Sequence, residues 1–503
     1  MSDPAFASKE SKEAIVSLSP SDPTDTPYWW KDRGLRSLNL RLLAILISPL
    51  MIGYDGSLIG SLLAMPFWYR DLGVSPKDSK LIGLMSAGYS FGAIMAFPLS
   101  SWIADRFGRK TLIMIGDVII IGGVLGQIFC FNARLYVLTR FILGFGAMLI
   151  IAGCPVLLTE LAHPRYRSSL VAGYASLFFL GSVIMSWTCF GTVNIPNQWS
   201  WRLPTVLQLL PPAIQLPLML RVSESPRWLI SRSRHSEAKE ILTRFHGNGR
   251  PDSEIVALEY KEICEEIQSD PKGHSTNWAL WLQGPGNRRR LLLVVTCTIF
   301  ASWSGGNIVI NYFALALNQV GITSPAQQTG INGGLQIFNF LVALISANVV
   351  DKFGRRKLFL LSSIIMLLAM VGFTVATEEF ARDARSGPGR ALVVLFFLFQ
   401  FGYDIGYAPL TAMYVAEICP YNLRASGIAL HYTLTSASQA ASQYANPVAL
   451  ENIGWKYYLV YIAILVFEVI FSYFLFPETK GYTVEQVAKI FDGQETERSE
   501  SDA

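Results

Sequence analysis

The chain has 503 residues, of which 51% are hydrophobic and only 16% charged, and its mean hydropathy is +0.36. This composition excludes a string of ordinary soluble domains. It indicates a membrane protein with many spans, because charge-free runs long enough to cross a ~30 Å hydrocarbon core recur along the chain. The net charge of +4 is small and dispersed, which excludes the basic surface of a nucleic-acid-binding protein.

Residues 1–37 are polar and rich in Pro, Ser and Asp, so we expect a disordered cytoplasmic tail without a cleavable signal. Twelve apolar segments follow, and each is predicted to cross the membrane as a helix. They cover residues 38–63, 80–104, 111–131, 135–160, 168–190, 202–221, 290–318, 326–350, 357–377, 390–416, 424–446 and 456–477. The predicted fold class is therefore all-α, with twelve transmembrane helices.

The longest polar interval, Arg221–Arg290, divides these spans into six and six. Within it, the amphipathic stretches Ser236–Phe245 and Glu254–Gln268 predict short helices on the membrane surface. The predicted domains are an N-terminal six-helix bundle at 38–221, a cytoplasmic linker at 222–289, a C-terminal six-helix bundle at 290–477 and a cytoplasmic tail at 478–503.

The orientation in the membrane follows from the number of spans and from the basic residues. An even number of spans puts both termini on the same side. The short loops give only a weak bias in Lys and Arg, but the basic flank Lys31–Arg41 and the cationic central loop favour cytoplasmic termini.

The second half of the chain repeats charged motifs of the first half. The loop sequence Asp105-Arg106-Phe107-Gly108-Arg109-Lys110 returns as Asp351-Lys352-Phe353-Gly354-Arg355-Arg356. Glu160 precedes Arg167 by seven residues, and Glu417 precedes Arg424 by seven residues. Internal duplication of this kind is typical of secondary transporters, so we expect the two bundles to be pseudo-symmetric.

Polar side chains inside the predicted spans are the candidates for function. Placing an ionisable residue within the hydrocarbon core costs free energy, and such residues typically mark transport pathways. They are Asp55, Asp117, Arg140, Asp404 and Glu468. Amide side chains gather in the seventh, eighth and eleventh spans, at Asn307, Asn311, Gln336, Asn339, Gln439, Gln443 and Asn446. A single amide side chain could equally join two helices or line a cavity. Seven such side chains in one half of the chain favour a polar cavity.

The sequence contains no motif of an enzyme. It has no metal-ligand spacing, no nucleophile elbow and no phosphate loop, so we expect no catalysis, cofactor or metal. Cys130, Cys154, Cys189, Cys297 and Cys419 lie in or beside apolar runs without CxxC spacing, which is typical of small buried hydrophobic residues.

An ordered set of motifs between Gly53 and Gly481 resembles the sugar porters of the major facilitator superfamily. The motifs are Gly53-Tyr54-Asp55, the two charged loops, Arg140 with Gly144 and Gly146, Pro155…Glu160…Pro164…Arg167, Glu224-Ser225-Pro226-Arg227-Trp228, Pro409…Glu417…Pro420…Arg424 and Pro477-Glu478-Thr479-Lys480-Gly481. Finer features are similar to the fungal lactose-permease and cellodextrin-transporter branch. They are Tyr54-Asp55-Gly56-Ser57-Leu58, Trp303-Ser304-Gly305, Tyr403-Asp404-Ile405 and Cys419-Pro420-Tyr421-Asn422-Leu423-Arg424.

The resemblance implies a plasma-membrane symporter of sugars and protons that works as a monomer by alternating access in membrane lipid. It implies proton coupling through Asp55 with Arg140 and sugar contacts at Asn307, Asn339, Thr435 and Gln439, and the amide cluster adds Asn311 and Gln336. It also implies a gating charge network that joins the bundles when the cavity opens outward. The members are Asp105, Arg106, Arg109, Glu160, Arg167, Glu224, Arg227, Asp351, Arg355, Glu417 and Arg424. An alternative interpretation is that the basic residues only determine the orientation of the chain in the membrane. That interpretation does not explain the paired glutamates.

The chain departs from the family pattern where a hexose would be held. Where the family has paired glutamines before the first Asn of span seven, this chain has Ala301 and Ser302. The amide residue of span five is replaced by Ala175, and the Trp of span ten is replaced by Ala412. These changes enlarge the pocket and remove amide contacts to hydroxyls. They favour either a larger sugar, such as a disaccharide or glycoside, over a hexose, or a less polar substrate altogether.

Two other functions stay open. The same fold can carry another solute, such as a polyol, an aromatic acid or a glycosylated metabolite. A sugar sensor that does not transport is the other alternative, and the short acidic tail after Pro477 favours a transporter over a sensor.

Overall fold

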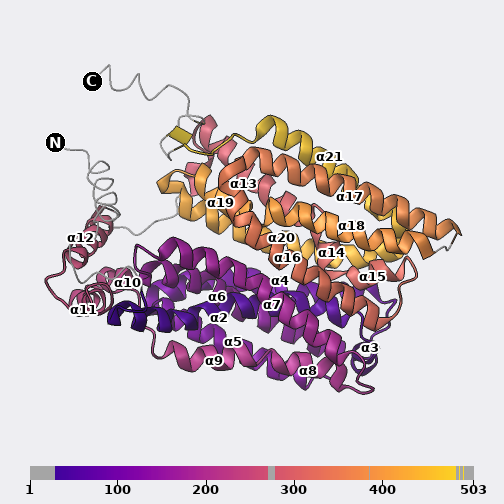
Figure 1. Cartoon of the computed structure of the whole chain (residues 1–503), viewed down its shortest axis with the longest axis horizontal. Coiled ribbons are helices and arrows are strands. Elements are labelled where there is room, and N and C mark those ends of the chain that lie inside the picture. The colour runs from indigo at the N-terminus through magenta and orange to yellow at the C-terminus, as the bar shows by residue number, and fades with distance from the viewer. Residues whose placement is uncertain (1–28, 270–277, 384–385, 483–485, 488–490, 492–503) are drawn as a thin grey trace.

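The computed structural model describes residues 29–269, 278–383, 386–482, 486–487 and 491. Within these residues the chain is helical and contains no strand. Two bundles lie along each other, one drawn in indigo to magenta and the other in orange to yellow (Figure 1). The predicted all-α fold class is confirmed.

The N-terminal bundle consists of six membrane-crossing segments and one short helix that follows the first of them. These are α2 (Arg33–Leu62), α3 (Pro66–Leu72), α4 (Ser79–Phe107), α5 (Arg109–Ile128), α6 (Ala133–Leu161), α7 (Arg167–Thr192) and the pair α8 (Trp199–Leu207) and α9 (Leu210–Met219). Side-chain caps fix several starts. Asp32 accepts the backbone N–H of Leu35 at 2.9 Å, so the first helix begins inside the segment 1–37 that was predicted as a tail. Residues 1–28 of that tail lie outside the described residues.

The C-terminal bundle repeats this arrangement with more interruptions. Its helices are α13 (Gly284–Trp303), α14 (Gly306–Asn311), α15 (Phe313–Asn318), α16 (Pro325–Phe353), α17 (Arg355–Asp383), α18 (Ser386–Ile405), α19 (Tyr407–Ile418), α20 (Tyr421–Ile453) and α21 (Tyr457–Leu475), with 3-10 turns η1 (Trp278–Leu282) and η2 (Gly454–Lys456).

Three of the twelve predicted spans are discontinuous helices. The sixth breaks between α8 and α9, where Pro211 and Pro212 supply no backbone N–H to continue the hydrogen-bond ladder. The seventh breaks at Gly305, whose φ of 108° is in the left-handed region, and the tenth breaks at Gly406.

A count by length and hydropathy gives ten candidate spans among the described helices. The difference from twelve has two causes. The halves of the sixth span are each too short to qualify, and Ser426–Leu475, which contains most of α20 and all of α21, is counted as one stretch.

The linker forms three helices at one end of the molecule, which we call the linker end. They are α10 (Pro226–Ser231), α11 (His235–Phe245) and α12 (Glu254–Ser269), and they lie at the left of Figure 1. The predicted stretches Ser236–Phe245 and Glu254–Gln268 correspond to α11 and α12. Helix α2 starts here, since the backbone N–H of Gly34 donates to Asn248 at 3.0 Å.

The two bundles pack most closely toward the opposite end, which we call the far end. There the last turns of α2 approach α14, and a Cβ on Gly60 would lie 2.6 Å from the carbonyl oxygen of Ile310. The first turns of α4 approach α20, and a Cβ on Gly83 would lie 2.8 Å from the carbonyl oxygen of Tyr444. Only glycine permits backbones this close.

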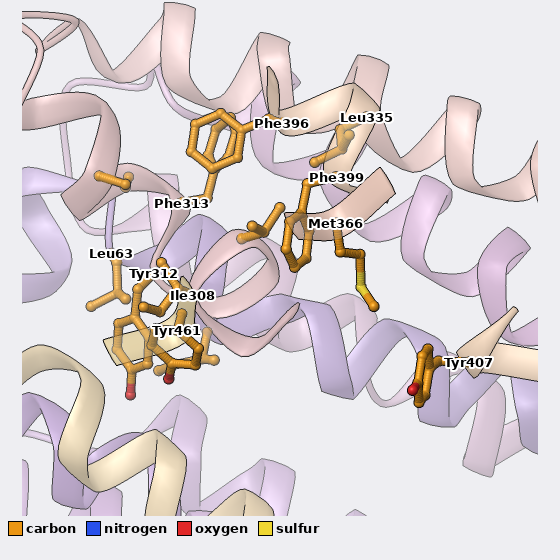
Figure 2. Close-up of a cluster of buried hydrophobic side chains, with 14 of the residues drawn as sticks. Leu63, Ile308, Tyr312, Phe313, Leu335, Met366, Phe396, Phe399, Tyr407 and Tyr461 are labelled. Atoms are coloured by element: carbon orange, nitrogen blue, oxygen red, sulfur yellow. The ribbon is translucent and has the colours of Figure 1, made fainter. Parts of the chain in front are cut away.

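One apolar cluster continues from the first span into the C-terminal bundle. Leu63 belongs to it together with Ile308 and Tyr312 of the seventh span and Tyr461 of α21 (Figure 2). Edge-to-face ring pairs reinforce it, such as Phe373 against Phe396 with centroids 4.6 Å apart. This shared core holds the bundles together near the far end.

Candidate transport site

Asp55 and Arg140 share a buried polar region of the N-terminal bundle. Asp55 on α2 is fully buried, and Arg140 on α6 is only 2% exposed. Arg140 and Gln208 are the polar neighbours of the carboxylate, yet neither carboxylate oxygen accepts a hydrogen bond. The Arg140 guanidinium instead lies over the ring of Tyr89 on α4, 5.0 Å from its centroid. The two charges are thus neighbours without a closed ion pair, a costly arrangement at this burial.

The predicted contact residues of the seventh span form one hydrogen-bonded group. The Asn307 side-chain nitrogen donates to the hydroxyl of Ser442 on α20 at 2.7 Å and to the carbonyl of Ser302 at 3.1 Å. Asn311 donates to the Asn307 oxygen at 3.3 Å. These amides therefore tie α14 to α13 and α20 at the helix break.

The predicted residues of the eighth span form a second group. With its nitrogen turned toward the acceptors around it, the Asn339 amide donates to the carbonyl of Leu335 at 3.1 Å and to a carboxylate oxygen of Asp404 at 3.2 Å. Gln336 donates to the Asn332 oxygen at 3.3 Å. Asn332 in turn donates to Ser61 of α2 at 2.9 Å, so this group reaches the N-terminal bundle.

Thr435 and Gln439 lie on α20, and among the described residues their side chains bond to neither group. Gln439 meets the first group only through its backbone carbonyl, which accepts from the Ser442 hydroxyl at 3.1 Å. The Thr435 hydroxyl bonds back to the carbonyl of His431 at 2.8 Å, one turn earlier in the same helix. The Gln439 side chain is half-buried. Amide side chains both donate and accept hydrogen bonds, so the two groups have the chemistry that binding of sugar hydroxyls requires.

At the linker end, the first charged loop forms a cluster inside the N-terminal bundle. Arg109 lies 3.5 Å from Glu160 and 3.9 Å from the exposed Asp105. Glu224 accepts the backbone N–H groups of Arg109 at 3.0 Å and Lys110 at 3.2 Å, so its carboxylate caps the positive end of α5. Burial raises the pKa of Glu224 above its ordinary value, although these N–H groups oppose the shift.

The second charged loop builds the same cluster in the C-terminal bundle. Arg355 contacts Glu417 through two nitrogens, at 2.9 and 3.1 Å. Glu478 accepts the backbone N–H groups of Arg355 at 2.8 Å and Arg356 at 3.3 Å. Glu478 is therefore the counterpart of Glu224, and neither ion pair described here spans the two bundles.

Sequence reasoning missed Glu478, although its signal was present. It stands in Pro477-Glu478-Thr479 directly after the last span, as Glu224 stands directly after the sixth. The glycines confirm the duplication. Gly108 and Gly354 have φ of 95° and 91°, and a Cβ on either would come within 2.7 Å of the facing glutamate oxygen.

The other predicted network residues are more dispersed. Arg167 pairs at 3.5 Å with Glu259 of linker helix α12, a partner that sequence reasoning did not identify. Arg106 is exposed at the end of α4, and Arg424 is half-buried on α20. Arg227 lies in α10. Asp351 lies near the end of α16, and its side chain is outside the described part of the structure.

Comparison with known proteins identifies the family. The family described as "Sugar (and other) transporter" matches residues 40–491. The MFS-type transporter criB of Aspergillus cristatus is 26% identical over 457 residues, covering 90% of this chain and 92% of that protein. Myo-inositol transporter 2 of Cryptococcus neoformans is 27% identical, covering 88% of this chain and 82% of that protein.

A second yeast relative and a solved structure agree with this match. The low-affinity glucose transporter HXT3 of Saccharomyces cerevisiae is 25% identical, covering 88% of this chain and 80% of that protein. The inward open conformation of the xylose transporter XylE from E. coli has the same fold, with a TM-score of 0.75 at 20% identity over 90% of this chain and 100% of that one. The chain belongs to the sugar porters of the major facilitator superfamily and is a membrane transporter, not an enzyme.

Proposed function

We propose that the protein is a proton-coupled sugar symporter that works by alternating access, with Asp55 as the proton carrier and Arg140 as its partner. The observation that carries this proposal is the fully buried Asp55 carboxylate beside Arg140, without a hydrogen bond to either oxygen. In surroundings of low dielectric constant, a carboxyl group without a partner favours its protonated form, whereas a guanidinium that approaches it favours proton release.

The coupling follows from movement of the bundles. Asp55 lies on α2 and Arg140 on α6, and the Arg140 guanidinium has Tyr89 of α4 as an alternative contact. When the helices shift during transport, the distance between carboxylate and guanidinium changes, and the proton affinity of Asp55 changes with it. Proton uptake on one side of the membrane and release on the other then drive the substrate.

The arrangement of contacts supports a state that is open toward the linker end. The close backbone approaches at Gly60 and Gly83 lie at the far end, where Ser90 also bonds to Gln443 at 3.2 Å across the bundles. At the linker end, the pairs Arg109–Glu160 and Arg355–Glu417 each stay within one bundle. In the opposite state, these charges would re-pair across the bundles and close the linker end.

The substrate that we propose is a disaccharide or a glycoside, as in the fungal lactose-permease and cellodextrin branch. The amides of Asn307 and Asn339 offer hydroxyl contacts, and the small residues Ala412 and Ala175 leave room for a second ring. Relatives are named for glucose and for myo-inositol, so polyhydroxylated cargo is common to these neighbours. A polyol is the alternative that uptake measurements would distinguish.

Substitution of Asp55 by Asn tests the proton coupling. The change keeps the shape but cannot titrate, so Asp55→Asn should abolish uphill sugar accumulation and proton influx while downhill counterflow exchange continues. Uptake in cells without endogenous sugar transporters and the pH of the medium measure both effects. Asp117→Asn is the matched control, because Asp117 is another fully buried carboxylate, on α5. Accumulation that survives Asp55→Asn in a well-expressed protein would refute the role of Asp55.

We further propose a plasma-membrane protein that functions as a monomer, with both termini and the linker in the cytoplasm. Cysteines introduced at Lys77, between α3 and α4, and at Asp252, between α11 and α12, should report opposite sides, since both side chains are exposed. An impermeant thiol reagent added to intact cells should label Lys77→Cys and spare Asp252→Cys. The reverse pattern would invert the orientation. Cys264, half-buried in α12, is replaced by Ser to remove background.

A further inference from the structure

A second carboxylate, Asp404, is buried beside the predicted sugar contacts of the eighth span. It stands near the end of α18, two residues before the helix break at Gly406, and is 1% exposed. One carboxylate oxygen accepts from the Gln400 side chain at 3.1 Å, and the other accepts from the Asn339 amide at 3.2 Å. Amide groups are its partners on both sides.

The charges around Asp404 differ from those around Asp55. Among the residues that the structure describes, no Lys, Arg or His nitrogen lies within 4.0 Å of the Asp404 carboxylate. The titratable groups of the surrounding helices are Tyr403 of α18, Tyr407 of α19 and Glu468 of α21, and Tyr403 lies near both acids. The polar partners of the Asp404 carboxyl group are therefore the amides of Gln400 and Asn339.

The contact with Asp404 decides which end of the Asn339 amide faces the substrate. Its nitrogen is used by the carbonyl of Leu335 and by Asp404, so its oxygen is the atom that remains to accept a hydrogen bond. An Asn side chain in place of Asp404 would offer both a donor and an acceptor at that contact, so the Asn339 amide could then present either end.

Asp404 also lies where two discontinuous spans meet. The hydroxyl of the adjacent Tyr403 donates to the carbonyl of Ala301 at 3.1 Å, close to the break of the seventh span at Gly305. In transporters, substrate and coupling-ion sites form at such helix breaks, because the freed backbone groups line them. Gln336, one turn before Asn339, leads through Asn332 to Ser61 of the other bundle.

We propose that Asp404 is a positioning residue that sets substrate specificity: it fixes the Asn339 amide so that its oxygen accepts a hydroxyl group of the sugar. The inference rests on the proposed function, in which Asn339 contacts the sugar. It adds that the substrate hydroxyl at this position must be a donor. A sugar with fluorine in place of that hydroxyl retains an acceptor but loses the donor, so it should be rejected.

The test measures competition for uptake by single-position deoxyfluoro analogues of glucose and cellobiose. In the wild-type protein, one fluorinated position should weaken competition by about tenfold, the factor expected for one lost hydrogen bond. In Asp404→Asn, the amide pair can form in either orientation, so this discrimination should fall to about twofold or less. Glu468→Gln is the matched control, because this buried acid accepts from Ser363 at 2.9 Å and contacts none of the predicted sugar residues. Its analogue ranking should be that of the wild type.

A double mutant separates positioning from a direct contact. If Asp404 acts through Asn339, then Asp404→Asn should change KM and analogue ranking no further in an Asn339→Ala background. An effect that persists in full in that background would overturn the proposal. So would an unchanged analogue ranking in Asp404→Asn alone.

The wild-type protein provides a measurement that does not depend on the folding of a variant. In purified protein, the parent sugar should raise the melting temperature more than the fluorinated analogue does, in the same ranking as their competition for uptake. Equal stabilisation by the two sugars would also overturn the proposal. Failure of the proposed function looks different, because the wild type would then show no saturable uptake of either sugar.

Discussion

At the scale of single residues, we expect the two amide groups to make separable contributions to sugar binding. Asn307→Ala and Asn339→Ala should each raise the KM for the transported sugar about two- to tenfold, because each removes one hydrogen bond of about 0.5–1.5 kcal/mol. Asn452→Ala is the control, since this exposed amide bonds only to the carbonyl of Val448 on its own helix. Uptake measured over a range of sugar concentrations provides KM. Unchanged KM in both variants would mean that these amides only join helices.

At the same scale, the capping glutamates explain why acidic residues follow the sixth and the last span. Glu224 and Glu478 each accept two backbone N–H groups at the start of the helix that follows a charged loop, α5 or α17, where the helix dipole favours a negative charge. The glycine before each helix leaves room for the carboxylate. The chemistry shared by the two halves is therefore a local one, set by the capping glutamate, the glycine beside it and the first residues of the helix.

At the scale of elements, the linker helices are attached to the N-terminal bundle through a histidine pair. His246, at the end of α11, lies 2.6 Å from Glu259 of α12 and 3.1 Å from the carbonyl of Leu161 in α6. The ring of His163 faces it, with centroids 5.2 Å apart. Burial opposes ionisation of Glu259, but His246 and Arg167 outweigh it and hold the pKa of Glu259 below its ordinary value.

This attachment should weaken in acid. Burial, followed by the charge of His246, lowers the pKa of His163 to about 4, whereas an undocked histidine has a pKa of about 6.5. His163 binds a proton more readily in the undocked state. The linker helices are therefore fully docked above about pH 6.5, and docking is lost as the pH falls toward about 4. Hydrogen exchange of α11 and α12 should accelerate over this window.

The substitution His163→Gln should flatten that pH dependence, because glutamine does not titrate. His235→Gln is its control, since His235 is an exposed histidine of α11 that bonds to Tyr260. If exchange in His163→Gln rises in acid as steeply as in the wild type, another group controls docking.

At the scale of the whole molecule, closure of the far end depends on glycines. A side chain at Gly83 would meet the backbone of Tyr444, so Gly83→Leu should disfavour this closed state by roughly 1–3 kcal/mol, or about 5- to 150-fold in population. Uptake should fall accordingly, while a cysteine at the far end becomes more reactive. Gly122→Leu is the control, because nothing lies within 4 Å of that position. Equal uptake by both variants would show that the far end does not need this contact.

The sequence by itself determined the all-helical membrane fold and the duplicated charged loops, and it predicts twelve spans divided at the linker. Apolar length decides which segments cross a membrane, because each backbone group in hydrocarbon must be bonded within its own helix. Amphipathic spacing likewise located α11 and α12 to within a few residues. The pairing of Arg355 with Glu417 follows the repeat, since duplicated motifs occupy equivalent places in the two bundles.

Only the tertiary structure decided which polar groups meet inside the bundles. Asp404 and Asn339 are far apart in the chain, and no periodicity indicates that α18 turns one toward the other on α16. Glu259 reaches Arg167 because the linker folds back on the bundle, which composition cannot indicate. Hydropathy fixes how deep a residue lies in the membrane, but rotation of each helix about its axis depends on the packing of its neighbours. That rotation determines which groups face each other at the transport site.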